Sequence, residues 1–243
     1  RDMAEVRMFL DHLEKYSPAL VDTTRAQAQA AQALDRIATD KGARDRYFTF
    51  MRDTDQASVR ARMIGLAERL GWLTPAEKRT ELIAMLDDRL ARPAVGAMDV
   101  DLVCTLNREH ALDDTLAALA KVSAERMRDV GHAGVLACLG SQPARARVLQ
   151  AITSVRDDDV QIAQVYLRHR PIVDVGELRL VAAAIARMDN QVAQVRALDT
   201  LAQHRLSDEK SLVALTDLFP VAKSLEVQRA IAGILIRADY ATL

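Results

Sequence analysis

Residues 157–188 read DDDVQIAQVYLRHRPIVDVGELRLVAAAIARM, and this stretch decides the fold class. On both sides of Pro171, apolar side chains recur every three or four positions, which is the spacing of one face of an α-helix. Asp174 stands before the second run and Glu177 follows three residues later, a pattern typical of a helix N-terminus. The stretch therefore predicts two helices separated by a break at Pro171.

The same unit is predicted over residues 55–91. Gly71 is a suitable stop for the first helix. Thr74 is a good N-cap for the second, because Pro75 fits the first helical position and Glu77 completes a capping box. This segment is therefore predicted to form a helix, a short turn and a second helix.

The pattern also recurs toward the C-terminus, where Ser207 is a predicted cap and where Pro220 and Ser224 introduce the last helix. We interpret three valines as equivalent positions of successive helices, at intervals of 32 and 35 residues: Val160, Val192 and Val227. Cys104 and Cys138 lie 34 residues apart. A period of this size, made of paired helices, indicates stacked repeats.

The composition agrees with an all-α chain. Half of the 243 residues are hydrophobic but only 4% are aromatic, and the chain has nine Gly and six Pro. An all-β chain needs more turn and β-branched residues, and a disordered chain has fewer apolar ones. The 33 basic and 34 acidic residues give a formal net charge of −1, so the chain has no global electrostatic attraction to nucleic acid.

Parts of the sequence resemble HEAT/armadillo-type α-helical repeats. The second helix of that family has the pattern D-x-x-V-R/Q-x-x-A-x-x-x-L, which is found here at Asp157–Gln161, Ala163 and Leu167 and more loosely in three other places. The resemblance implies an all-α, right-handed superhelical stack of about six or seven antiparallel helix pairs. An irregular helical bundle is the alternative.

We expect a single domain with three regions. Residues 1–54 would form N-terminal capping helices, including a helix with Ala26, Ala30, Ala33 and Ile37 on one face. Residues 55–156 would form partly irregular middle repeats, and residues 157–243 the C-terminal repeats.

The resemblance implies a protein-interaction or scaffold module, part of a larger protein, that binds a partner protein or peptide on a concave helical surface. Polar side chains of the second helices are the candidate contacts: Arg60, Gln161, Gln164, Arg168, Gln194 and Gln228. Such a row suits extended polar or acidic segments. The competing interpretation is that these are simply the solvated positions of amphipathic helices.

No catalytic motif is found. The five histidines are scattered without HExxH spacing, and no phosphate-binding loop or GxSxG elbow occurs. We therefore expect no catalytic, cofactor or metal site, and no enzyme activity. Two alternatives stay open: a HEAT-like nucleic-acid-acting enzyme of the DNA glycosylase type, with Trp72 as a candidate aromatic, and a regulatory domain of an enzyme encoded upstream.

Two short runs have structural interpretations. We expect Asp157, Asp158 and Asp159 to stabilise a helix N-terminus, and the glycines of GHAGVLACLG to permit close helix packing.

The two cysteines lie in apolar runs and are expected to be buried thiols, with a single disulfide as the alternative. No run approaches the length of a membrane span, so we expect no membrane insertion. The expected compartment is the cytoplasm, with the periplasm as the alternative because the sequence begins at Arg1 rather than Met.

Overall fold

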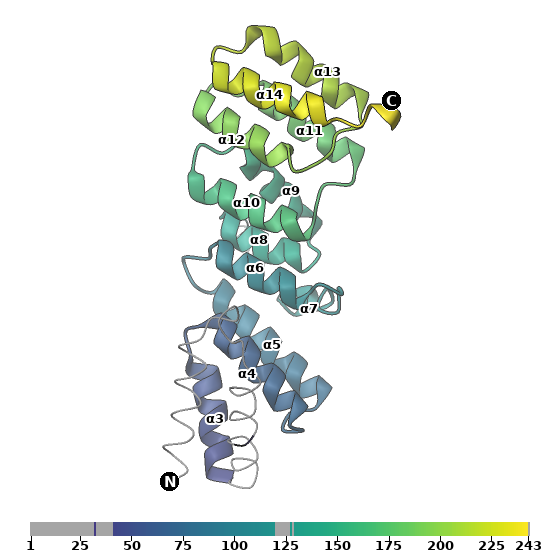
Figure 1. The fold of residues 1–243 in the computed structure, drawn as a ribbon. Coiled ribbons are helices and arrows are strands. Elements are labelled where there is room, and N and C mark those ends of the chain that lie inside the picture. Colours follow the sequence, from purple (N-terminus) through teal and green to yellow (C-terminus); the bar gives the residue numbers. More distant parts are fainter. Residues whose placement is uncertain (1–31, 33–40, 120–126, 128, 243) are drawn as a thin grey trace. The chain divides into compact units, whose positions relative to one another are not determined.

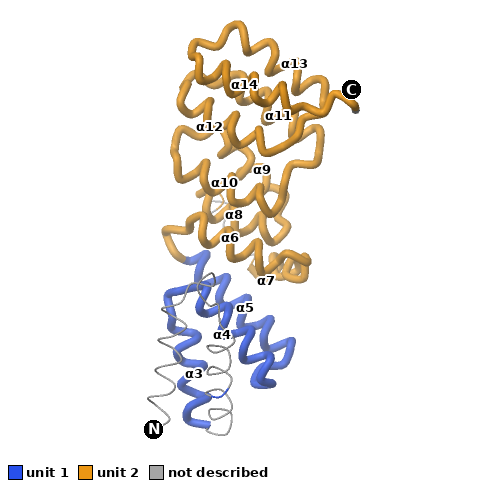
Figure 2. The backbone as a smooth tube through the Cα atoms, in the orientation of Figure 1, with its two compact units in different colours: residues 1–91 blue, residues 92–243 orange. Residues whose placement is uncertain are grey.

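The fold is described by a computed structural model, which covers residues 32, 41–119, 127 and 129–242. Within these residues all regular structure is helical, with twelve α-helices and no strand (Figure 1). The chain divides into two compact units, residues 1–91 and 92–243 (Figure 2). No boundary at residue 91 is predicted from the sequence. The predicted face of Ala26, Ala30, Ala33 and Ile37 lies outside the described residues.

The described part of the first unit has three helices: α3 (Lys41–Asp53), α4 (Ala57–Arg69) and α5 (Pro75–Leu90). The predicted helix, turn and helix over 55–91 is confirmed. Gly71 has a φ of 73°, a left-handed conformation that favours glycine, and the amide of Trp72 returns to Ala67 O at 2.9 Å. Thr74 and Glu77 form the predicted capping box at the start of α5.

The second unit has nine α-helices in the described residues. They are α6 (Ala97–Leu106), α7 (Thr115–Ala118), α8 (Val130–Cys138), α9 (Gln142–Gln150), α10 (Asp157–His169), α11 (Val175–Ala186), α12 (Gln191–Leu201), α13 (Glu209–Leu218) and α14 (Leu225–Arg237). Short 3-10 turns follow α9, α13 and α14, at Ala151–Thr153, Phe219–Val221 and Tyr240–Thr242.

The helix caps of the last two pairs are spaced by 34 residues. Asp174 caps α11 and Asp208 caps α13, while Asn190 caps α12 and Ser224 caps α14. Each of these side chains accepts a hydrogen bond from the amide three residues later. In space, α11 packs on α13 and α12 packs on α14. The two pairs therefore begin at equivalent points of sequence and lie against each other.

Two details of the predicted repeat are wrong. The cap of α13 is Asp208, not Ser207. Val192 is largely exposed while Val160 and Val227 are buried, so the three valines are not equivalent. In α12 the buried residue three positions after the cap is Ala193. It aligns with Val227 of α14 at the 34-residue spacing.

Helix α8 is the most enclosed of the described helices of the second unit, because all nine of its residues are buried. A Cβ atom on Gly131 would lie 1.7 Å from Val95 O, and one on Gly134 would lie 2.6 Å from Val100 Cγ2. The expectation that glycines here permit close packing is confirmed. The predicted acidic helix start is confirmed as well, since Asp157, Asp158 and Asp159 form the first turn of α10.

Candidate interaction surfaces

Two of the six predicted contact residues are not on the surface. Arg60, in the first unit, is buried and its Nη1 lies 2.6 Å from Asp88 Oδ2. Gln194 is 5% exposed, and its Nε2 donates to Ile185 O at 2.9 Å. The expectation that these side chains face solvent is wrong. Each lies at a helix position where a long polar side chain reaches a partner on the neighbouring helix.

Two further predicted residues are half-buried and already hydrogen-bonded within the chain. Gln164 Nε2 donates to Thr200 Oγ1 at 3.0 Å, which joins α10 to α12. Gln228 Nε2 donates to Phe219 O at 3.2 Å, which joins α14 to the turn after α13. These side chains contribute first to the packing of successive helices.

Gln161 and Arg168 are exposed on α10. With Gln164 between them, they are spaced three and four residues apart and share one face of the helix. Of the predicted row, therefore, the structure brings together Gln161, Gln164 and Arg168 as a polar stripe on α10. The rest of the row is not continuous with it.

A groove that the sequence analysis missed lies between α9 and α11. Its volume is about 390 Å³. It is lined by Ala146, Leu149 and Gln150 of α9, Thr153 of the following turn, Glu177, Leu180, Val181 and Ala184 of α11, and Arg187 at the C-terminal cap of α11; we call this the α9–α11 groove. Leu180 is 73% exposed at its edge, although it belongs to a helix whose core contacts are made by other residues. The only signal in the sequence is that apolar residues of α11 extend beyond a single helical stripe.

Arg145 fixes one end of this groove. Its Nε and Nη2 donate to the two carboxylate oxygens of Glu177, each at 2.9 Å, and its Nη1 donates to the hydroxyl of Tyr166 and to Arg170 O, each at 3.1 Å. Hydrogen bonding to Glu177 raises the pKa of Arg145 above its usual value, against the effect of burial. Burial likewise raises the pKa of Tyr166. The guanidinium thus stays charged and ties α9, α10 and α11 together.

The charge of the groove follows from this arrangement. Glu177 is neutralised by Arg145, since both of its carboxylate oxygens accept from one guanidinium. Arg187 lies exposed at the other end of the lining stretch of α11, with no ion pair to any described residue. The groove is therefore an apolar depression with one uncompensated positive charge.

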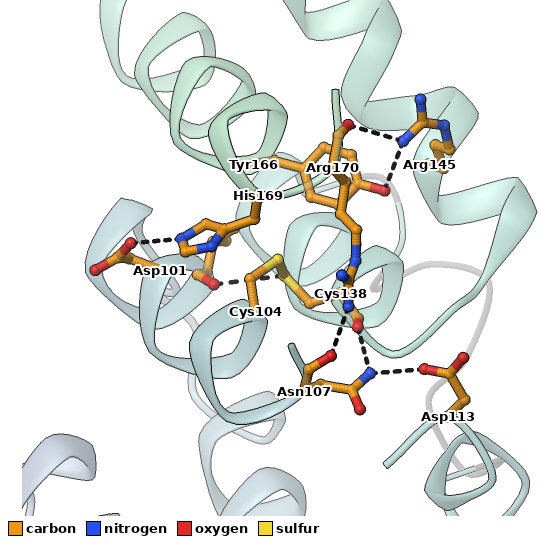
Figure 3. The surroundings of a disulfide bond; sticks show 10 residues. Asp101, Cys104, Asn107, Asp113, Cys138, Arg145, Tyr166, His169 and Arg170 are labelled. Carbon is orange, nitrogen blue, oxygen red and sulfur yellow. Dashed lines mark hydrogen bonds and ion pairs between the residues drawn. A yellow bond between two sulfur atoms is a disulfide. The ribbon is translucent and has the colours of Figure 1, made fainter. Parts of the chain in front are cut away.

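A polar network around Asn107 is connected to Arg145 through Arg170 (Figure 3). Asn107 is fully buried; its Nδ2 donates to Cys138 O at 2.7 Å and to Asp113 Oδ1 at 2.6 Å. The main-chain carbonyl oxygen of Asn107 accepts a hydrogen bond from Arg170 Nη2 at 2.7 Å. Hydrogen bonds thus lead from the end of α6, through Arg170, to Arg145 at the groove.

The network adjoins a disulfide bond between Cys104 of α6 and Cys138 of α8 (Figure 3). The expectation of two buried thiols is therefore wrong in its chemistry, although both side chains are buried. The alternative of a single disulfide is the one observed. Apolar surroundings made a buried thiol and a buried disulfide equally consistent with the sequence.

A polar cavity of about 890 Å³ lies in the first unit, lined by residues of α3, α5 and the turn before α5. Arg44 donates to Trp72 O at 2.9 Å, with its Cζ 5.5 Å from the Trp72 ring centroid, and Arg52 pairs with Glu81 at 2.6 Å. Trp72 is itself buried and packs edge-on against Tyr47, with centroids 5.2 Å apart. Its ring is thus not an exposed platform for stacking a base.

Within the described residues, no group of three or more His, Cys, Asp and Glu side chains is placed to hold a metal ion. None of the helices described is both long enough and apolar enough to span a membrane. Comparisons with protein-family models, with curated proteins and with solved structures give no match for this chain.

Proposed function

We propose that the chain is a helical-repeat module of the HEAT/armadillo type that binds a partner protein, and that the α9–α11 groove receives the partner. The observation that carries the proposal is an exposed apolar groove with a single uncompensated charge, held open between two helices. The repeat interpretation is supported by caps spaced at 34 residues and by the packing of α11 on α13 and α12 on α14.

The dimensions of the groove suit a helix. Its lining residues run along α11 from Glu177 to the cap residue Arg187, a length of about 15 Å at 1.5 Å per residue. Ala146 and Ala184 are small, so they leave room for larger side chains of a partner. Leu149, Val181 and Leu180 supply apolar surface against which such side chains would lose contact with water. About three turns of an amphipathic helix fill this length.

The positive charge of Arg187 indicates which side chains a partner should carry. We propose an amphipathic helix with Leu, Ile, Val or Phe at positions i, i+3 or i+4, and i+7, and with an acidic side chain placed to meet Arg187. The polar stripe on α10 is proposed as a second, weaker contact, since Gln161 and Arg168 are exposed and able to donate hydrogen bonds.

A displayed library of helical peptides, selected against the whole chain, tests the proposal. We expect enrichment of peptides with the apolar spacing given above, and binding lowered at least tenfold by Leu180→Asp, which puts a charge on the apolar edge. Val192→Asp is the matched control, because Val192 is 70% exposed and is not part of the groove lining. Selected peptides that bind the Leu180→Asp and wild-type chains equally would contradict the groove as the docking site.

The acidic side chain is tested separately by a charge exchange. Arg187→Glu should weaken a selected acidic peptide, and changing the acidic residue of that peptide to Lys should restore binding to the Arg187→Glu chain. Equal affinity of all four combinations would remove the charge requirement while leaving the apolar contact in place.

A further inference from the structure

The disulfide lies in a closely packed seam between α6 and α8 of the second unit. Gly131, Gly134 and Cys138 are spaced three and four residues apart and face one side of α8. Opposite them are Val95, Val100 and Cys104, since the glycines approach Val95 and Val100 and the cysteines are bonded. Cys104 and Cys138 are 1% and 0% exposed. The cross-link is therefore enclosed by packing on both helices.

The surroundings of the disulfide are built to hold it in this place. The carbonyl of Cys138 accepts from the fully buried Asn107, whose Oδ1 accepts from the amide of Leu112 at 2.7 Å. The end of α6 and the end of α8 are thus joined twice, once by the disulfide and once by Asn107. Both cysteines of the chain are used, so no thiol is left for exchange.

From this arrangement we infer that the chain is a substrate for a disulfide donor and completes its folding in an oxidising compartment. Disulfides of this kind persist outside the reducing cytosol of most cells, where glutathione and thioredoxin keep thiols reduced. Formation transfers two protons and two electrons. The thiols of Cys104 and Cys138 become one disulfide, while a disulfide of the donor, a protein or small-molecule disulfide, becomes two thiols.

The burial of both sulfurs sets the order of events. Exchange passes through a mixed disulfide, so a sulfur of the donor must touch Cys104 or Cys138. Neither is accessible once α6 and α8 are packed. The exchange therefore precedes the final packing of α8, and the finished disulfide is a structural cross-link, not one that cycles between oxidised and reduced forms.

The test compares the whole chain made in the reducing cytosol of a bacterial host with the same chain exported to the periplasm. Each sample is quenched with acid, denatured, treated with a maleimide and weighed by mass spectrometry. We expect two maleimides on the cytosolic chain and none on the exported chain. We also expect the urea midpoint of the cytosolic chain, measured in reductant, to be lower by about 1–2 M.

The double variant Cys104→Ala, Cys138→Ala is the control, because it removes the cross-link and keeps small apolar side chains. Its urea midpoint should match that of the reduced chain in both compartments. An exported chain carrying two maleimides, a cytosolic chain carrying none, or a double variant as stable as the oxidised chain would each overturn the inference.

Discussion

Arg145 of α9 and Arg179 of α11 are 34 residues apart, and each makes an ion pair with a carboxylate at the start of a later helix. Arg145 pairs with Glu177 near the start of α11, and Arg179 donates to Asp208, the cap of α13, at 2.7–3.1 Å. The next position at this spacing is Val213 on α13, an exposed apolar residue. Arg145 thus joins α9 to the beginning of α11, and Arg179 joins α11 to the beginning of α13.

The Arg179–Asp208 pair makes the chain sensitive to strong acid. Hydrogen bonds from Arg179, and from the amide and hydroxyl of Ser211, lower the pKa of Asp208 to about 2. A carboxyl with a lowered pKa stabilises the fold above its unfolded pKa of about 3.9, and this stability is lost as the pH falls through 2. Asp208→Asn keeps a capping side chain but removes the charge. Its urea midpoint should be below that of the wild type at pH 7, and the difference should vanish near pH 2. Asp199→Asn, at an exposed position of α12, should show no such pH-dependent difference.

His204 should contribute a second pH dependence, at milder pH. Burial lowers the pKa of His204, and its Nε2 accepts a hydrogen bond from the amide of Ile172 at 3.1 Å. The neutral ring is therefore the folded form. Stability should be complete above about pH 6.5 and decline as the pH falls toward the lowered pKa of the folded state, because the unfolded chain takes up the proton first. Urea unfolding at pH 7.5 and 5 should show a smaller loss in His204→Gln than in the wild type. An equal loss in both chains would assign the pH dependence to other groups.

Leu201 and Gln194 should both be needed for the packing of α12. Leu201 is 1% exposed, so Leu201→Ala should cost about 2–5 kcal/mol through lost burial and a cavity. Gln194→Ala should cost about 1–2 kcal/mol, because it removes a buried hydrogen bond to Ile185 O. Hydrogen exchange of Leu201→Ala should show faster exchange over residues 157–238 and unchanged protection over the described residues before 91. Uniform loss of protection would indicate one cooperative core and contradict the repeat proposal.

The glycines of α8 should tolerate no side chain. Gly134→Ala brings a methyl group within 2.6 Å of Val100 Cγ2 and should cost about 1–3 kcal/mol, and Gly131→Ala meets the backbone oxygen of Val95 and should cost more. Gly65, in α4, has no heavy atom within 4 Å of its Cβ position. Gly65→Ala should therefore be neutral or stabilise by up to about 1 kcal/mol. Thermal unfolding of the three variants gives the order, and a stable Gly131→Ala chain would show that α8 can move away from Val95.

Local signals predicted the helices well. Thr74 and Asp174 are identifiable as caps because capping depends on the next three residues alone. At the start of α13 the local signal is ambiguous, since Ser and Asp can both cap a helix. Asp208 is held there by hydrogen bonds from Ser211 and from Arg179 of another helix.

The surfaces were harder to predict, because they depend on which helices meet. Gln194 lies on a polar position of its own helix, but α11 covers it. Leu180 continues the apolar run of α11, but α9 leaves it exposed. Neither fact is contained in the periodicity of one helix. The division into two units at residue 91 also depends on which helices meet. The helical pattern of the sequence continues on both sides of it and does not indicate a boundary.

The 34-residue spacing of Asp174 and Asp208 has a consequence for how such a chain can change in length. Residues 174–207 begin with an aspartate cap and end just before another one. A duplicate of this segment, inserted between Ser207 and Asp208, would supply its own aspartate to the original Arg179 and its own arginine to Asp208. The arginine–aspartate contact that joins α11 to α13 would therefore be kept at both junctions when the second unit is extended by a whole helix pair.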